Sequence, residues 1–367
     1  MRGMNSGMNI SIGLKNVGRR LLNERPEVIL SGKKRVPNLD ALKLMSLILV
    51  LCLHCADNYY YATGVNSLWS MTRFVYCCGV LAIPMFFMVS GYQLLGRKDV
   101  GYGYAWKKIG KILRAAFLLY LLVVALKWLI LDKEIIVIDI PRQFCLNLFQ
   151  KGDYGLIWFV GGLCLVYLAY PIINWIYREK KRQFLYVTGG LVCIMSFVFF
   201  FSIVRPVNGI ISEFDVPQTL RLWNWLGYFC LGGLIKRYDV LDWLGRWSIV
   251  IMMSMGCFVF LNLIASIRGI RFCEYAYASV PIMIFVVSVF ALFMKFKMNN
   301  RFMEEMAVIF MPAYLLGSVF LEWIAGPMMQ LPEVIGAIVY VAVNAILSLT
   351  AGWMLMKIPG MKKLLRL

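Results

Sequence analysis

Long apolar runs, separated by short polar and basic segments, follow one another through nearly the whole chain. Each run has about 20 residues, the length an α-helix needs to cross a ~30 Å hydrocarbon core. The runs lie at 39–60, 74–96, 112–131, 156–177, 184–204, 219–236, 247–267, 276–294, 305–325 and 334–356. The pattern therefore predicts an all-α transmembrane helical bundle of about ten spans. We expect Pro312 to bend the ninth span, and we see no internal repeat and no span interrupted at mid-membrane.

Composition supports a membrane protein. The chain has 367 residues, of which 61% are hydrophobic and 16% charged, whereas soluble domains have about 45–50% and about 25%. A net charge of +19 would suggest nucleic acid in a soluble protein. Here the basic residues punctuate apolar runs, so we predict membrane lipid and no nucleic acid as a partner.

Most of the 38 Lys and Arg residues fall in alternate loops, on the side that holds the N-terminus. Basic loops stay in the cytoplasm, and a missed helix would reverse every later loop. Because the alternation holds to the end, both termini are predicted to be cytoplasmic. Residues 1–36 are expected to form a basic, flexible cytoplasmic segment without the apolar region of a cleavable signal peptide. Residues 37–367 form the predicted transmembrane domain.

The ten cysteines show no paired framework. Only Cys145 and Cys273 fall in loops predicted to lie outside, and we do not expect them to form a disulfide. Cys52 and Cys55 flank a histidine, but no second ligand pair accompanies them, so no metal site is predicted.

His54, in the first span, is the only histidine in the chain. An ionisable side chain inside a membrane is costly and indicates function by default, and imidazole suits acid–base chemistry near neutrality. Asp57 lies one turn further on and can accept the other ring N–H. We therefore predict His54 and Asp57 as catalytic residues. The alternative is a structural histidine at the outer interface.

Lys43 lies eleven residues before His54, which puts both on nearly the same helical face about 16 Å apart. Asp40, one turn before Lys43, can pair with it. This polar stripe must face other helices or a cavity. The alternative is a simple ion pair at the cytoplasmic end of the span, with Lys43 reaching toward the headgroups.

The third span begins with a basic segment in which Lys107, Lys111 and Arg114 share one helical face. Such a cluster at the inner mouth of a bundle suits a polyphosphate, and coenzyme A carries one. The alternative is the general excess of basic residues on the inner side. We predict that Lys43, Lys107, Lys111 and Arg114 bind coenzyme A. A polar channel lined by Asp40, Lys43 and Arg114 should then lead to His54.

The chain resembles the acyltransferase-3 family of membrane O-acyltransferases from about 35 to about 355. The similarity is carried by Arg35-x4-Asp40-x2-Lys43-x10-His54 and Phe86-Phe87-x-x-Ser90-Gly91-Tyr92, with the basic segment 106–114, Trp158-Phe159, Tyr167, Pro171 and Tyr228-Phe229-x-Leu231-Gly232. Without that context, Ser90-Gly91 would indicate only close helix packing.

The resemblance implies an enzyme of the bacterial cytoplasmic (inner) membrane. It would move acetyl from cytoplasmic acetyl-CoA to a hydroxyl of a cell-surface or lipid-linked glycan, such as O-antigen, capsule or exopolysaccharide. Ser90, Tyr92 and Trp158 are then expected to contact substrate, with Ser90 or Tyr92 stabilising the oxyanion. Many relatives carry a second histidine after a Tyr-Leu-Leu in the ninth span. Here the stretch is Tyr314-Leu315-Leu316-Gly317, so a mechanism with two histidines is excluded.

Two other functions fit a polytopic membrane protein. One is a transporter or flippase of a lipid-linked glycan, which would more often show inverted repeats and interrupted helices. The other is a membrane-embedded sensor or binding module. The sequence carries no signal for an oligomeric state.

Overall fold

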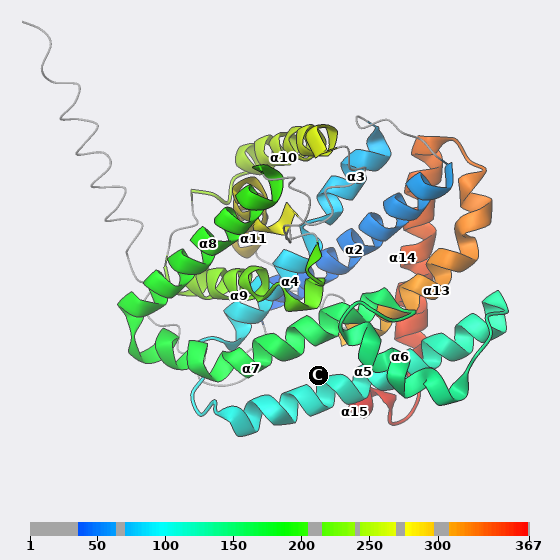
Figure 1. Ribbon diagram of the computed structural model, residues 1–367, viewed down its shortest axis with the longest axis horizontal. Helices are drawn as coiled ribbons and strands as arrows, with labels where there is room; N and C mark the ends of the chain where they lie inside the picture. The colour runs from blue at the N-terminus through cyan, green and yellow to red at the C-terminus, as the bar shows by residue number, and fades with distance from the viewer. Residues whose placement is uncertain are drawn as a thin grey trace, which may run out of the picture.

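The computed structural model describes residues 36–63, 70–204, 215–238, 243–268, 276–296 and 308–365. Within these ranges the chain forms α-helices joined by short 3₁₀ turns and loops, packed into one bundle (Figure 1). This confirms the all-α fold. The predicted N-terminal segment lies outside the described residues except for Val36.

The helices follow the apolar runs. They are α2 (Pro37–Thr63), α3 (Met71–Gly79), α4 (Ala82–Leu94), α5 (Tyr102–Leu131), α6 (Ile140–Leu148), α7 (Trp158–Glu179), α8 (Lys181–Val204), α9 (Leu222–Arg237), α10 (Trp247–Arg268), α11 (Val280–Lys295), α13 (Phe310–Met329), α14 (Glu333–Lys357) and α15 (Met361–Leu365). Seven segments of the described chain are long and apolar enough to cross a membrane, counting α3 and α4 as one. α9, α11 and α13 occupy the other predicted runs.

The second span is two helices, so the expectation of uninterrupted spans was wrong. α3 ends at Gly79 and α4 begins at Ala82. Pro84 explains the break, because it has no N–H to donate to the Val80 carbonyl four residues earlier and its ring crowds that carbonyl. The new helix starts with a hydrogen bond from Met85 N to Leu81 O of 3.0 Å.

The described part of the ninth span is interrupted near Pro312. Val308 is helical, Ile309 is in a turn, and α13 begins at Phe310. Pro312 has no N–H to donate to the Val308 carbonyl four residues earlier, so the interruption agrees with the expected effect of this proline.

Hydrogen bonds at one end of the bundle join helix ends that the distribution of Lys and Arg predicts to lie on the cytoplasmic side of the membrane. Asn38, in the first turn of α2, donates to Phe293 O (2.7 Å) and Phe296 O (2.6 Å) at the end of α11. Lys236, at the end of α9, donates to Leu95 O after α4 (2.6 Å). These contacts agree with helices that alternate in direction.

The opposite end of the bundle shows the matching contacts. Tyr59 of α2 donates to Leu331 O between α13 and α14 (2.8 Å). Thr72 of α3 donates to Glu333 of α14 (2.9 Å). Ten membrane crossings with cytoplasmic termini remain a prediction, with which this pairing of helix ends is consistent.

Two glycines let α4 and α9 cross in backbone contact. A Cβ on Gly91 would lie 1.8 Å from Phe229 O, and a Cβ on Gly232 would lie 2.0 Å from Met88 O. The two family-like motifs of the sequence therefore meet at this crossing. Close approach of small residues is how helices associate in membranes, where the hydrophobic effect gives no preference between helix and lipid.

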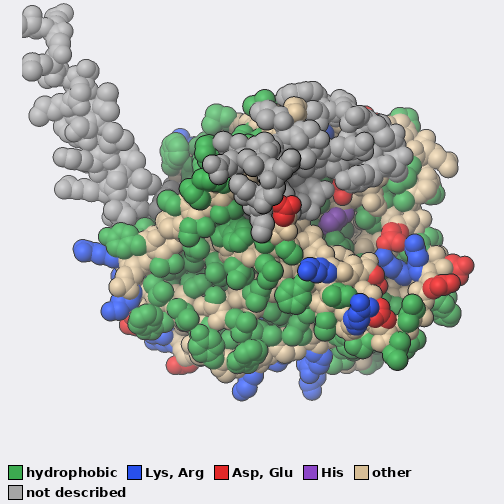
Figure 2. Space-filling model, in the orientation of Figure 1, with side chains coloured by type: hydrophobic (Ala, Val, Ile, Leu, Met, Phe, Trp, Pro, Cys, Tyr) green, Lys and Arg blue, Asp and Glu red, His purple; other side chains and the backbone are tan. Residues whose placement is uncertain are grey.

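Large apolar side chains cover much of the outer surface (Figure 2). Phe197 of α8 is 62% exposed and Met252 of α10 is 64% exposed. Such a surface is costly in water and suits hydrocarbon.

Candidate active site

His54 lines a pocket where α2 meets α13, α14 and the 3₁₀ turn Gly155–Ile157. The purple of histidine is visible in a hollow of the surface in Figure 2. The pocket is small: about 10 Å³ of it is free to the centre of a water molecule, which is room for about one water. It is therefore a narrow recess beside the imidazole. The other lining residues are Val50, Leu51, Leu156, Tyr314, Gly317, Ser318, Leu321 and Asn344.

Close packing on α2 builds the pocket walls. A Cβ on Gly317 would lie 2.8 Å from Leu51 Cδ2, so glycine lets α13 reach α2 beside His54. On the α14 side, Asn344 is fully buried and donates to Cys55 Sγ at 3.5 Å. The Ser348 hydroxyl donates to Asn344 O at 2.6 Å, and its oxygen lies 3.2 Å from Asn344 Oδ1.

Ser318, a residue of the pocket wall on α13, forms a hydrogen bond with a hydroxyl outside the pocket lining. Ser318 Oγ donates to the buried Tyr154 hydroxyl at 2.5 Å, and Tyr154 donates to Leu315 O. Burial raises the pKa of Tyr154, so this phenol is neutral at physiological pH. Within the described residues no group hydrogen-bonds to the His54 ring, which leaves its nitrogens available to a bound hydroxyl.

Asp57 lies one turn beyond His54 on α2 and is half-buried. The structure shows no hydrogen bond between the side chains of Asp57 and His54. Its role in orienting the imidazole stays a prediction.

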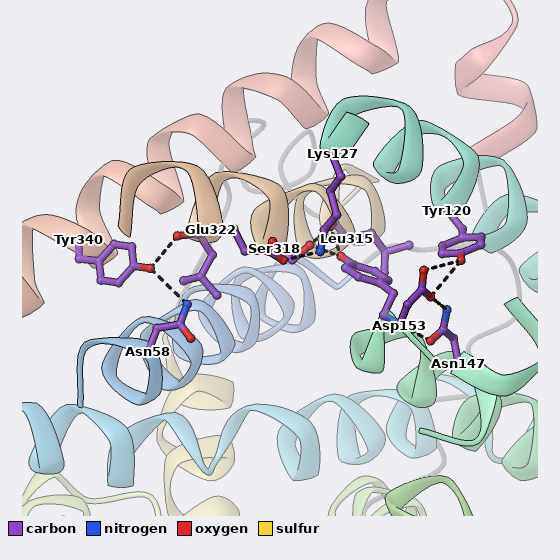
Figure 3. A network of polar contacts seen from close by, with 11 residues as sticks. Asn58, Tyr120, Lys127, Asn147, Asp153, Leu315, Ser318, Glu322 and Tyr340 are labelled. Carbon is purple, nitrogen blue, oxygen red and sulfur yellow. Dashed lines mark hydrogen bonds and ion pairs between the residues drawn. The ribbon is translucent and has the colours of Figure 1, made fainter. Parts of the chain in front are cut away.

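A row of polar groups extends from this pocket across α13 (Figure 3). Lys127 of α5 forms an ion pair with Glu322 of α13, and its Nζ lies 5.2 Å from the centre of the Tyr154 ring. We call this set the polar row; its members are Asn58, Lys127, Asp153, Tyr154, Ser318 and Glu322.

The two ends of the polar row are held by further hydrogen bonds. Asn58, one turn above His54, donates to the Tyr340 hydroxyl at 3.4 Å. At the other end, Asp153 accepts from Tyr120 at 3.0 Å and from Asn147 at 2.8 Å. Sequence reasoning gave none of these residues a role, although Lys127 and Glu322 are charges within apolar runs, a signal that could have found them.

Lys43 pairs with Asp40 as predicted, with Lys43 Nζ 3.6 Å from Asp40 Oδ1. The Asp40 side chain is 2% exposed and that of Lys43 21%. Neither residue lines the His54 pocket, and neither does Arg114, although a channel shared with His54 was expected.

The three predicted cations of α5 share an exposed face, and their contact with coenzyme A stays a prediction. Lys107, Lys111 and Arg114 are all exposed, whereas Lys108 is half-buried. Lys108 interacts electrostatically with Lys111, Arg97 and Lys43. The cation that α5 directs toward Lys43 is therefore Lys108, which the sequence did not single out.

Ser90 lies too far from His54 to stabilise an oxyanion there. α2 and the α3–α4 pair run antiparallel, and a Cβ on Gly79 would lie 2.8 Å from Leu49 O. Ser90 lies two residues before Tyr92, whose ring is 5.8 Å from that of Phe290. Phe293, one turn further on, accepts from Asn38 at the start of α2, so Ser90 lies toward the end of α2 opposite to His54. Its hydroxyl donates to Phe86 O at 3.0 Å within its own helix.

The other two predicted substrate contacts pack in the bundle. Tyr92 follows Ser90 and its ring lies 5.8 Å from that of Phe290, so it too is remote from His54. Trp158 is 6% exposed, and its ring lies 5.4 Å from that of Trp225. It is two residues from Leu156, a residue of the pocket wall, and its contact with substrate stays a prediction.

Comparison with known families decides the class of the protein. The model of the acyltransferase-3 family, an acyltransferase domain, matches residues 36–357. The chain belongs to this acyltransferase family. Comparisons with curated proteins and with solved structures gave no match. In this acyltransferase, Gly317 occupies the position where the resemblance implies a second histidine in relatives, and it lines the His54 pocket.

Metal and disulfide chemistry were not expected of this acyltransferase. No group of three or more His, Cys, Asp or Glu side chains suited to a metal occurs among the described residues. Cys145 is an exposed free thiol, and Cys273 lies outside the described residues.

Proposed function

We propose that this membrane acyltransferase moves an acetyl group from cytoplasmic acetyl-CoA to a hydroxyl of a cell-surface or lipid-linked glycan in a bacterial cytoplasmic membrane. The observation that carries the proposal is the position of His54. The only imidazole of an acyltransferase domain lines a pocket between α2, α13 and α14. Acyl transfer to a hydroxyl needs a base at the attacking oxygen, and imidazole suits that role.

The cations at the other end of α2 support an anionic donor. Lys43 and Lys108, with Arg97 and Lys111 nearby, offer ammonium and guanidinium groups to the phosphates of coenzyme A. Lys43 lies about 16 Å along the helix axis from His54. A pantetheine arm of that order of length would carry the thioester from the cations to the imidazole.

The proposed step is direct transfer. His54 takes the proton of the acceptor hydroxyl as its oxygen attacks the thioester carbonyl carbon. The carbon–sulfur bond then breaks, and the coenzyme leaves as a thiol with the proton returned by the imidazolium. Asn344, which lines the pocket and has only a weak sulfur acceptor at 3.5 Å, is better placed than Ser90 or Tyr92 to donate to the oxyanion.

Reconstituted protein tests this function. The purified protein is placed in vesicles that hold radiolabelled acetyl-CoA inside. Glycan extracted from a strain that lacks the protein is added outside, and it should become labelled. The break in the second span is a feature common in transporters and favours the second candidate, a flippase. Movement of unlabelled glycan across the vesicle without acetyl transfer would support the flippase and contradict the acyltransferase proposal.

We expect Lys108→Ala and Lys43→Ala to raise the KM for acetyl-CoA by about tenfold or more, since a hydrogen bond to a charged group contributes about 1.5–3 kcal/mol. Lys107→Ala is the matched control, because Lys107 is exposed next to Lys108 on the same helix. Initial rates at varied acetyl-CoA measure the effect. Equal KM values for Lys107→Ala and Lys108→Ala would contradict this donor site.

A further inference from the structure

The polar row contains an ion pair where ionised groups are costly. Lys127 lies in α5 and Glu322 in α13, both within helices of a membrane bundle. Charged residues in such helices mark functional sites by default. Glu322 directly follows Leu321, and Leu321 and Ser318 line the His54 pocket. The row is therefore continuous with the wall of the proposed reaction site.

The row is open to a hydrophilic ligand. The Lys127 side chain is 19% exposed, that of Glu322 is 37% exposed, and Asp153 is exposed.

The carboxylates of the row are held in place but retain acceptor capacity. Tyr120 and Asn147 fix Asp153, and Lys127 binds Oε1 of Glu322. A carboxylate can accept about four hydrogen bonds. Within the described residues, Oε2 of Glu322 makes no hydrogen bond, so a ligand with several hydroxyl donors finds fixed acceptors here.

We propose that the polar row is the acceptor subsite, where Glu322 and Asp153 accept hydrogen bonds from the hydroxyls of a sugar ring. This inference rests on the proposed function and names the acceptor site of the same reaction. Asn58 lies one turn from His54 on α2, and Ser318 belongs both to the row and to the pocket wall. A sugar bound along the row therefore presents one hydroxyl to the imidazole.

Steady-state kinetics with labelled acetyl-CoA and the glycan from a strain lacking the protein tests the subsite. Glu322→Gln and Asp153→Asn should raise the KM for the glycan by about tenfold to a hundredfold, with the KM for acetyl-CoA unchanged. Glu134→Gln, at an exposed carboxylate outside the row, is the matched control and should leave both values unchanged. Unchanged glycan KM values in both row variants would overturn the subsite.

A charge swap separates acceptor binding from a structural bridge. Lys127→Glu combined with Glu322→Lys restores an ion pair but moves the carboxylate to the other helix. If the pair binds the acceptor, the swapped protein keeps the raised glycan KM, and recovery of the wild-type value would overturn the proposal. If the wild-type protein transfers no label, the proposed function itself is wrong. If it transfers label but the row variants keep the wild-type glycan KM, only the acceptor subsite is wrong.

Discussion

Replacing His54 with alanine is expected to lower acetyl transfer by about 10²–10⁴-fold, the usual loss when a general base is removed. The chain has no second histidine to take over, and Gly317 in the pocket wall has no side chain that could do so. Label incorporation into the glycan, measured with matched amounts of purified protein, gives the loss. His54→Gln should be as inactive as His54→Ala, because an amide keeps polarity and size but cannot accept the proton.

Cys52→Ala is the control for this experiment. Cys52 is half-buried in the same helix, two residues from His54, and does not line the pocket. Cys52→Ala should retain near wild-type transfer. Both variants should have the same midpoint of thermal unfolding, which shows that the loss in His54→Ala is not a loss of folding. Activity of His54→Ala within about threefold of wild type would remove the basis of the proposed mechanism.

The second large effect is expected on folding. Gly91→Ala should disrupt the crossing of α4 and α9, because the new Cβ would lie 1.8 Å from Phe229 O. Overpacking costs about 1–3 kcal/mol where side chains can yield, and a rigid carbonyl yields less. Gly232→Ala should do the same against Met88 O. We expect low yields of monodisperse protein in detergent and a lowered midpoint of thermal unfolding for both variants.

Gly110→Ala and Gly190→Ala are matched controls, since a Cβ at either helical position meets nothing within 4 Å. Alanine is favoured over glycine in a helix by about 1 kcal/mol, so these variants should be as stable as wild type or slightly more. Ser90→Ala should also fold and transfer acetyl normally, because its hydroxyl bonds only within its own helix. If Gly91→Ala unfolds like Gly110→Ala, the crossing tolerates a methyl group and its proposed role is wrong.

The sequence by itself determined the membrane class, the apolar helices, the family and the outstanding histidine. The length of an apolar run is a local property, and it fixes how much chain can cross hydrocarbon. The Asp40–Lys43 pair was also predictable, because residues one turn apart are neighbours on any helix. His54 was found because it is the only imidazole and lies in an apolar run.

The direction that each helix faces could not be predicted, and the basic segment of α5 shows why. In a membrane bundle both lipid-facing and core-facing positions are apolar, so periodicity does not tell inside from outside. Lys107, Lys111 and Arg114 share a face as predicted, but only packing decided that this face is exposed and that Lys108 lies near Lys43. The break in the second span did have a local signal, Pro84, which was overlooked because the apolar run continues through it.

The composition of the site was decided only by tertiary structure. Asn344 and Cys55 are 289 positions apart in sequence and meet beside the pocket, and Ser318 and Gly317 arrive from a third helix. Ser90 and Tyr92 belong to a family-like motif, yet the antiparallel register of α2 with α3–α4 places them toward the other end of the bundle. Spacing along one helix gives reliable distances, but spacing between helices depends on side-chain packing and close glycine contacts, which no single segment encodes.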